Sequence, residues 1–204
     1  MPEGVLITFE GIEGAGKTTQ IELLVNWLIE HNITHRYFRE PGSTALGEKV
    51  RELLLNDNHI DIDPVSELFL YLSARSALVH KELKPALADG YLVILDRFTD
   101  STIAYQGYGL GIDIEMVKQA CSLASSGLKP DITFLLDISP EDGLSRLSEF
   151  DKIESRGLEF LKRVRSGFLR LAEEDKDRII VIDATQSIET ISHIIIDRLS
   201  EFKV

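Results

Sequence analysis

Short apolar runs alternate along the chain with segments in which apolar residues recur at helical spacing. The runs that favour strands are VLITFE (5–10), HRYFR (35–39), YLVILD (91–96), DITFLLDI (131–138) and RIIVID (178–183). Apolar residues three and four positions apart indicate helices, as in 21–28 and 188–202. Strands that are apolar on both faces belong to a parallel sheet covered by helices on two sides. The pattern therefore predicts an α/β fold, a three-layer α/β/α sandwich with a five-stranded parallel sheet.

Glycine and proline fall between the predicted elements, as at 41–42 and 107–111, and the chain shows no internal repeat and no linker. We therefore expect residues 1–204 to form a single domain. The least regular stretch, SRLSEFDKIESRG at 145–157, is charged and only weakly periodic. It is predicted to form a mobile lid between two helices, with a solvated helix face as the alternative.

Charge and composition narrow the possible partners. The formal net charge is −12, and such a surface repels nucleic acid and anionic membranes but still permits a small phosphorylated substrate. No apolar run approaches the roughly 18 residues that span a bilayer, and no secretion signal is apparent at the N-terminus. The single cysteine, Cys121, suits a reducing cytoplasm, and its apolar helical surroundings favour a packed side chain over a reactive thiol. We therefore expect a cytoplasmic protein.

The first predicted strand leads into GIEGAGKT (11–18), which has the Gly-x4-Gly-Lys-Thr spacing of a phosphate-binding P-loop. Its glycines allow backbone N–H groups to wrap a phosphate, and the N-terminus of the following helix favours negative charge. Lys17 is expected to reach the β- and γ-phosphates, and the hydroxyl of Thr18 to bind Mg²⁺. This predicts a nucleoside triphosphate site, which GTPases, ATP-driven switches and small-molecule kinases share. No Asn-Lys-x-Asp motif for guanine follows.

Two other stretches carry side chains suited to a second ligand. In REPGST (39–44), Arg39 precedes a rigid Pro-Gly turn at the carboxyl end of a predicted strand, where α/β proteins bind ligands. In ELFLYLSARSALV (67–79), Tyr71 and Arg75 stand four residues apart and therefore share one helix face. A ring and a guanidinium placed in this way could stack on a base and hydrogen-bond to it. An ordinary turn and a surface Tyr/Arg pair are the alternatives.

A third stretch, LVILDRFTDSTIAYQG (92–107), puts Asp96 and Arg97 at the end of an apolar strand. An acid at this place commonly orders Mg²⁺ and its water shell, and an arginine can clamp a phosphate through paired hydrogen bonds. An ion pair at the end of the strand is the alternative.

Taken together, these motifs make the chain resemble bacterial thymidylate kinases. FEGIEGAGKTTQ, REPGST, LYLSAR, DRFTDSTIAYQG and KPDITFLLD follow the family's order and separations, from FEG at 9–11 to DAT at 183–185. The resemblance implies the fold of the P-loop nucleoside-monophosphate kinases. It also implies transfer of the γ-phosphate of ATP to dTMP, which yields dTDP and ADP in dTTP biosynthesis, with Mg²⁺ as cofactor. A homodimer is a further implication.

The resemblance also implies the residues of the site. The ATP-binding set would be Gly11, Ile12, Glu13, Gly14, Ala15, Gly16, Lys17, Thr18, Thr19, Arg146 and Ala184. The dTMP-binding set would be Glu13, Arg39, Pro41, Tyr71, Arg75, Arg97, Thr102, Tyr105 and Gln106, with Arg39 and Arg97 near the acceptor phosphate. Thr18, Asp96 and, through water, Glu10 would serve the magnesium. The catalytic set would be Lys17, Asp96, Arg97 and Arg146.

Several of these residues have distinct roles in proteins of this kind. Glu13 matches an acid that hydrogen-bonds the 3′-hydroxyl of dTMP, and Tyr105 matches a tyrosine that favours a deoxy sugar. Tyr71 matches the ring that stacks on thymine, and Arg75 the arginine at its carbonyl edge. The acceptor phosphate, with a second pKa of about 6, is mostly deprotonated at neutral pH. Alignment and charge neutralisation can therefore drive the transfer without a strong general base.

The predicted lid departs most from the family pattern. Relatives with a glycine at the position of Gly14 take positive charge from a basic lid, whereas residues 149–151 here are Glu-Phe-Asp. We expect Arg146 to close over the transferring phosphoryl group with Lys152 assisting, and Arg156 is the next candidate.

Two alternative functions remain open at this point. One is another nucleoside-monophosphate kinase, acting on UMP, CMP or AMP. The other is a P-loop binding or switch protein without a small acceptor, and the Tyr71/Arg75 and Asp96-Arg97 pairs argue against it.

Overall fold

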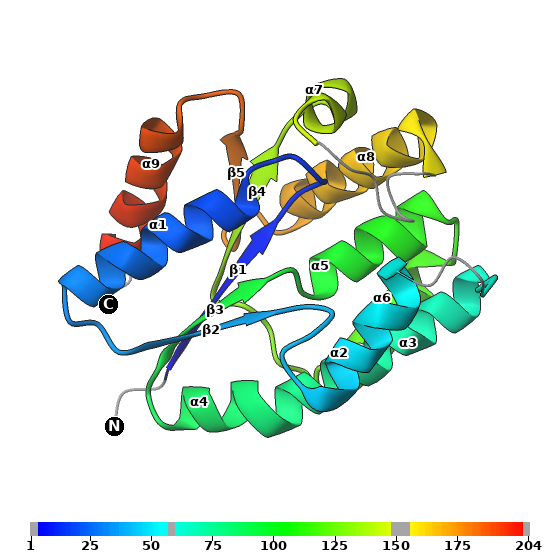
Figure 1. Ribbon diagram of the computed structural model, residues 1–204, viewed down its shortest axis with the longest axis horizontal. Helices are drawn as coiled ribbons and strands as arrows, with labels where there is room; N and C mark the ends of the chain where they lie inside the picture. The colour runs from blue at the N-terminus through cyan, green and yellow to red at the C-terminus, as the bar shows by residue number, and fades with distance from the viewer. Residues whose placement is uncertain (1–3, 57–59, 148–155, 202–204) are drawn as a thin grey trace.

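A five-stranded parallel sheet lies at the centre of the computed structural model, which describes residues 4–56, 60–147 and 156–201 (Figure 1). The strands are β1 (Val5–Glu10), β2 (His35–Arg39), β3 (Leu92–Asp96), β4 (Ile132–Asp137) and β5 (Ile179–Asp183). They lie side by side in the order β2-β3-β1-β4-β5. The predicted strands agree with these bounds to within one residue at each end.

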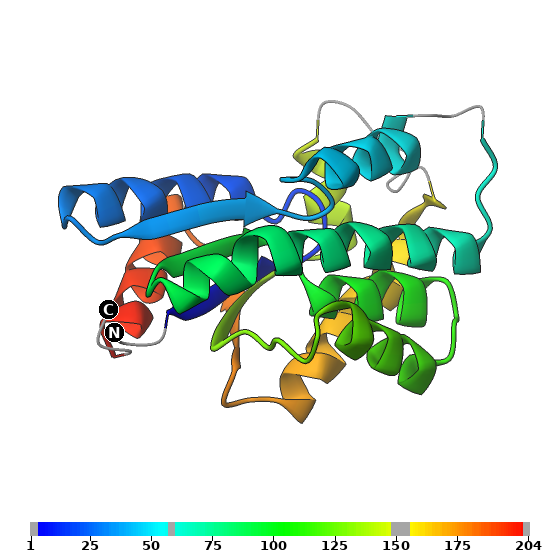
Figure 2. The same ribbon diagram turned by 90° about the horizontal axis from the view of Figure 1, so that it is seen from below.

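Helices cover both faces of the sheet. They are α1 (Lys17–Glu30), α2 (Ala45–Arg51), α3 (Pro64–Leu78), α4 (Lys84–Ala88), α5 (Thr99–Thr102), α6 (Ile114–Ala124), α7 (Pro140–Ser145), α8 (Leu158–Glu174) and α9 (Ile188–Glu201). π-Helical turns at Glu52–Asn56, Val79–Leu83 and Ile103–Gly109 continue α2, α3 and α5. Figure 2 shows α1 on one side of the strands and α8 on the other. The predicted three-layer sandwich is therefore confirmed.

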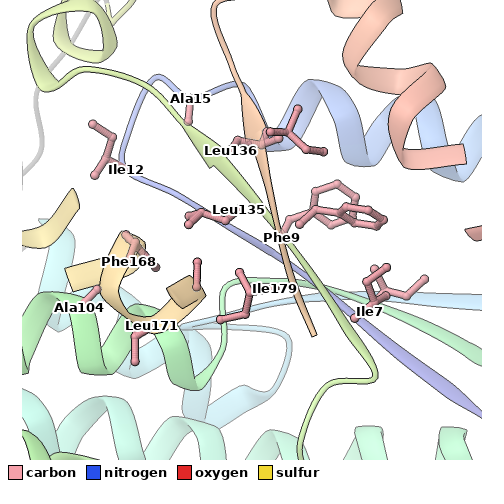
Figure 3. Close-up of a cluster of buried hydrophobic side chains, with 14 of the residues drawn as sticks. Ile7, Phe9, Ile12, Ala15, Ala104, Leu135, Leu136, Phe168, Leu171 and Ile179 are labelled. Atoms are coloured by element: carbon pink, nitrogen blue, oxygen red, sulfur yellow. The ribbon is translucent and has the colours of Figure 1, made fainter. Parts of the chain in front are cut away.

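The core forms because alternate residues of each buried strand face opposite layers. On β1, Ile7 and Phe9 belong to the cluster that includes α1 and α9, whereas Leu6 packs with the side chains of α3, α4 and β3. Figure 3 shows part of this core, with Ile7 and Phe9 on one side of the strands and Phe168 and Leu171 on the other. All five of these side chains are buried, so both layers are fixed against the sheet.

The parallel register brings the predicted motifs to one edge of the sheet. Phe9 on β1 and Arg39 on β2 both pair with Asp96, the last residue of β3. Three segments therefore begin next to one another at the carboxyl ends of neighbouring strands: the P-loop after β1, the REPGST turn after β2 and the Asp96-Arg97 turn after β3. This is the edge at which open α/β sheets bind ligands.

The predicted lid at 145–157 includes residues 148–155, which lie outside the described part of the chain. Among the described residues, no helix combines the length and apolar character that a membrane span requires.

Candidate active site

The P-loop curves from β1 to α1 through three glycines in left-handed backbone conformations. Gly11, Gly14 and Gly16 have φ values of 136°, 74° and 90°, which other residues adopt only with strain. A Cβ added at Gly14 would lie 2.1 Å from the carbonyl oxygen of Gly143 on α7, so no side chain fits there. No side chain caps α1 at Gly16, so the N–H groups of its first turn remain available to an anion.

Lys17 lies under this loop as a buried cation. Its Nζ donates hydrogen bonds to the carbonyl oxygens of Gly11 at 3.0 Å and Ile12 at 2.9 Å. Burial, together with the positive charge of Arg97, lowers the pKa of Lys17 to about 8. An anionic ligand in the loop would favour the charged form and give the ammonium a stronger partner than a peptide carbonyl.

Two cavities meet at the P-loop. The first, of about 280 Å³, lies between the loop, the β2–α2 turn, α3 and α5, and the second lies between the loop, the start of α9 and Arg146. Gly14, Lys17, Thr18 and Leu147 line both of them. A group passed from one cavity to the other would therefore travel past the P-loop lysine.

The structure gathers most of the predicted site residues around these cavities. In addition to Gly14, Lys17 and Thr18, the first is lined by Glu13, Pro41, Tyr71, Arg75, Asp96, Arg97, Thr102, Tyr105 and Gln106. The second is lined by Ala15, Gly16, Thr19, Arg146 and Ala184 in addition to the shared residues. Glu10, Gly11, Ile12 and Arg39 are absent from both linings.

Glu13 is held in the first cavity by two neighbours of the β3–α5 region. The Tyr105 hydroxyl lies 2.8 and 2.7 Å from the two Glu13 carboxylate oxygens, and Arg97 Nη2 donates to Oε1 at 2.8 Å. The guanidinium of Arg97 also lies 5.1 Å from the centre of the Tyr105 ring. The negative charge of Glu13 is therefore balanced by Arg97 within the same cavity.

A buried ion pair lines this cavity. Arg75, only 2% exposed, donates from Nε at 2.8 Å and from Nη2 at 2.6 Å to Oε2 of Glu40. Its Nη2 also donates to the carbonyl oxygen of Phe98 at 3.0 Å. Burial raises the pKa of the Glu40 carboxyl, although Arg75 lowers it. Tyr71 lines the same cavity from one turn earlier on α3, so Tyr71 and Arg75 are not an exposed surface pair.

Glu10 and Arg39 are engaged elsewhere. The Glu10 carboxylate is fully buried and accepts hydrogen bonds from Phe98 and Ser101 at the start of α5. Burial and the nearby Asp100 raise the pKa of Glu10 to about 8. Arg39 donates to both carboxylate oxygens of Glu48, at 3.0 and 2.9 Å, with its side chain 45% exposed.

The sequence interpretation missed several residues of the first cavity, namely Glu40, Arg51, Leu55, Ser101 and Leu147. Arg51, at the end of α2, donates from Nη1 to the carbonyl oxygen of Pro41 at 3.1 Å. Glu40 stands inside the REPGST motif, between Arg39 and Pro41, which the sequence predicts for the site, so its acidic side chain was the available signal. Arg51 was less clearly indicated by the sequence, because it lies at the far end of α2, the helix that follows the motif.

Two of the three lid candidates fall within the described residues. Arg146 donates to the carbonyl oxygens of Gly14 at 3.3 Å and Ala184 at 3.2 Å, so it bridges the P-loop and the β5–α9 turn. Arg156 pairs instead with Glu67, a buried acid on α3 that also accepts from Gln106 at 3.0 Å. Lys152 lies outside the described residues.

The first cavity also offers oxygen ligands suited to a hydrated cation. Within the described ranges, Oδ1 of Asp96 is buried and has no hydrogen-bond partner, and Thr18 exposes its side chain in the same cavity. No group of three or more acidic, cysteine or histidine residues suited to a metal occurs in that part of the chain. These residues therefore fit Mg²⁺ that retains part of its water shell and not a cation fully enclosed by protein ligands.

Comparisons with known proteins agree on one family. The family model described as thymidylate kinase matches residues 9–195. The thymidylate kinase of Sulfurihydrogenibium sp. (strain YO3AOP1) is 49% identical over 201 residues, which cover 97% of this chain and 98% of that protein. That of Carboxydothermus hydrogenoformans is 49% identical over 180 residues, with coverage of 87% and 88%. The crystal structure of thymidylate kinase from Ehrlichia chaffeensis superposes with a TM-score of 0.80 at 38% identity, covering 97% of this chain and 100% of that one.

Proposed function

The chain belongs to the thymidylate kinase family, and from this premise we propose that it transfers the γ-phosphate of ATP to dTMP, forming dTDP and ADP. The observation that carries the proposal is the pair of cavities that meet at the P-loop. A nucleotide kinase must bind a donor and an acceptor on either side of the transferred group and hold them in line. Two separate cavities that share Gly14, Lys17 and Thr18 suit this requirement.

The first cavity suits the acceptor dTMP. Tyr71 offers a ring for stacking on the base, and Arg75 beside it offers a guanidinium for the carbonyl edge. Glu13 and Tyr105 would contact the sugar, and the Tyr105 ring would leave little room for a 2′-hydroxyl. Arg97, which lines the same wall, would bind the phosphate.

The second cavity suits ATP, with its phosphates in the P-loop and its adenosine toward Ala184. Lys17 would exchange its two peptide carbonyl contacts for the β- and γ-phosphates. Arg146, which already spans Gly14 and Ala184, would lie over the donor phosphates. Thr18 and Asp96 would hold Mg²⁺, which when bound neutralises phosphate charge and orients the phosphate oxygens.

Charge neutralisation replaces proton transfer as the main catalytic device. The acceptor phosphate has a second pKa of about 6 and is largely a dianion at neutral pH, so its oxygen can attack without a general base. Lys17, Arg97 and Arg146 would then stabilise the charge that spreads over the transferring group. The enzyme's residues would supply an in-line arrangement and fixed positive charge.

A panel of nucleoside monophosphates tests the proposal. Rates of ADP formation and of diphosphate formation would be measured with dTMP, dUMP, UMP, CMP and AMP at fixed ATP and Mg²⁺. We expect dTMP to give the highest kcat/KM, with one diphosphate formed per ADP. A rate with UMP equal to that with dTMP would overturn the substrate assignment. ATP hydrolysis that does not respond to dTMP would favour a P-loop switch protein instead.

A further inference from the structure

Glu10 is a buried carboxylate, and neither cavity exposes it. It is the last residue of β1, has 0% exposure and lines neither pocket at the P-loop. Its Oε1 accepts from the backbone N–H of Phe98 at 2.7 Å and of Ser101 at 3.4 Å, and its Oε2 accepts from the Ser101 hydroxyl at 2.5 Å. All three donors belong to residues 97–101, where the chain turns from β3 into α5, here called the β3–α5 corner. The carboxylate therefore ties this corner to the strand that carries the P-loop.

The residue inside this corner, Arg97, has an unusual backbone conformation. Its φ is +66°, in the left-handed region that residues with a Cβ adopt only at an energetic cost. Its own N–H donates to the Phe9 carbonyl oxygen at 3.0 Å, and the next N–H, of Phe98, donates to Glu10. These contacts from β1 hold the peptide groups on both sides of Arg97. Such a conformation persists only when its surroundings fix it.

The Ser101 hydroxyl connects Glu10 to the guanidinium of Arg97. It donates its proton to Oε2 of Glu10 and accepts a hydrogen bond from Arg97 Nη1 at 3.0 Å. The hydroxyl therefore lies between the two side chains, with Oε2 of Glu10 fixing its place and its oxygen facing Arg97. The other contacts of the guanidinium, with Gly11 at 3.0 Å and Glu13 at 2.8 Å, complete its placement in the first cavity.

We propose that Glu10 is a positioning residue for Arg97: through Phe98 and Ser101 it holds the left-handed corner and aims the guanidinium at the acceptor phosphate. This rests on the proposed function, which assigns that phosphate to Arg97. It differs from the expected role of Glu10 in the water shell of Mg²⁺, because all of its described hydrogen bonds go to the β3–α5 corner.

The test compares Glu10→Gln, Ser101→Ala and a control, Thr8→Val. Glutamine keeps one oxygen but turns the other into an N–H donor, which faces the Ser101 hydroxyl and reverses its polarity. Thr8 lies two residues before Glu10 on the same strand, and its buried hydroxyl pairs with that of Thr133 at 2.7 Å. Thr8→Val therefore removes a buried hydrogen bond from the same strand without touching Arg97.

Isothermal titration calorimetry measures the affinity for dTMP in the absence of ATP and metal. Steady-state kinetics then measure the KM for ATP and the dependence of the rate on Mg²⁺. We expect Glu10→Gln and Ser101→Ala each to weaken dTMP binding about tenfold, the effect of losing one hydrogen bond to a charged group. We expect the KM for ATP and the Mg²⁺ concentration at half-maximal rate to stay within about twofold, a separation that simple loss of stability would not produce. Thr8→Val should lower the melting temperature and leave dTMP binding unchanged.

Two results would overturn the proposal. Glu10→Gln could bind dTMP as the wild type does while needing about tenfold more Mg²⁺, in which case Glu10 serves the metal. Ser101→Ala removes only a hydroxyl, so it can be tested even if Glu10→Gln does not fold. If Ser101→Ala binds dTMP as tightly as the wild type does, the proposed link from Glu10 through Ser101 to Arg97 is wrong. Failure of the wild type to bind or phosphorylate dTMP would instead refute the proposed function, so the two failures are distinct.

Discussion

Arg75→Met is expected to destabilise the protein strongly, because it leaves the buried carboxylate of Glu40 without its cationic partner. Both partners are almost fully enclosed, and Oε2 of Glu40 receives two hydrogen bonds from Arg75. Its Oε1 has no partner among the described residues, so nothing else there compensates the charge. Breaking a buried pair from one side costs about 3–5 kcal/mol. For a chain of this size, this lowers the melting temperature by about 6–20 °C.

The destabilisation should also depend on pH. Burial already raises the pKa of Glu40, and Arg75 is the group that opposes this rise. Removing Arg75 raises the folded-state pKa further, whereas the unfolded value stays near the ordinary value for glutamate. Between these two values the folded state binds more protons, so stability falls as pH rises. Arg75→Met should therefore lose more stability at pH 8 than at pH 5.5.

Urea unfolding followed by circular dichroism at both pH values measures these effects. The double variant Glu40→Met/Arg75→Met removes both charges, and it should recover most of the stability, because an apolar pair of similar volume often replaces a buried ion pair without loss. Its binding of dTMP should not recover, since both side chains line the first cavity. The reasoning fails if Arg75→Met costs less than about 1 kcal/mol, or if the double variant is no more stable than Arg75→Met.

The remaining predictions concern the P-loop, the donor side and the buried thiol. Lys17→Ala should abolish phosphoryl transfer with an unchanged circular dichroism spectrum, since the ammonium is the cation buried within the loop; normal turnover would refute the P-loop assignment. Glu13→Gln should raise the KM for dTMP more than it weakens ATP binding in calorimetry, and a defect in ATP binding alone would contradict this role. Arg146→Ala should lower kcat about a hundredfold to a thousandfold, as losses of charge-stabilising donors do; an unchanged kcat would favour Arg156 in this role. Burial raises the pKa of the Cys121 thiol, so Ellman's reagent at pH 8 should label it much faster in urea than in the native protein; equal rates would show that α6 does not cover it.

The sequence predicted the fold well because its main signal is burial on both faces. β4, with Ile132–Asp137 inside the predicted 131–138, is mostly apolar, and its first five residues are buried on both faces of the sheet. Such a short run favours a central parallel strand, and the glycines and prolines between runs mark the connections. The P-loop could be predicted equally well, because the spacing of its residues fixes a backbone geometry that does not depend on residues far away in the sequence.

The side chains at the ends of strands were harder to predict, because neighbouring residues there point in opposite directions. At the end of β2 the sequence predicts the cation Arg39 for the site, whereas the acid after it, Glu40, lines the first cavity. Arg39 pairs with Glu48 on α2. Which of two adjacent side chains enters a site depends on the twist of the strand and the turn that follows it. The residue types at 39 and 40 indicate a polar turn, but they do not show which of the two side chains faces the cavity.

Each acid near the phosphate-binding loop has a partner that explains its presence there. Glu13 lies against Arg97, Glu40 lies against Arg75, and Glu10 holds the corner from which Arg97 projects. Each carboxylate fixes the place of a cationic or hydrogen-bonding group before a nucleotide arrives, so the positive charge meets the phosphate already oriented. Removing the negative charge of Glu13 should therefore weaken the use of an anionic acceptor, although simple electrostatics predicts stronger binding. Removing one negative charge has a small effect compared with losing the fixed position of the Arg97 guanidinium. A guanidinium that is out of place loses its hydrogen bond to the phosphate and also the alignment on which the transfer depends.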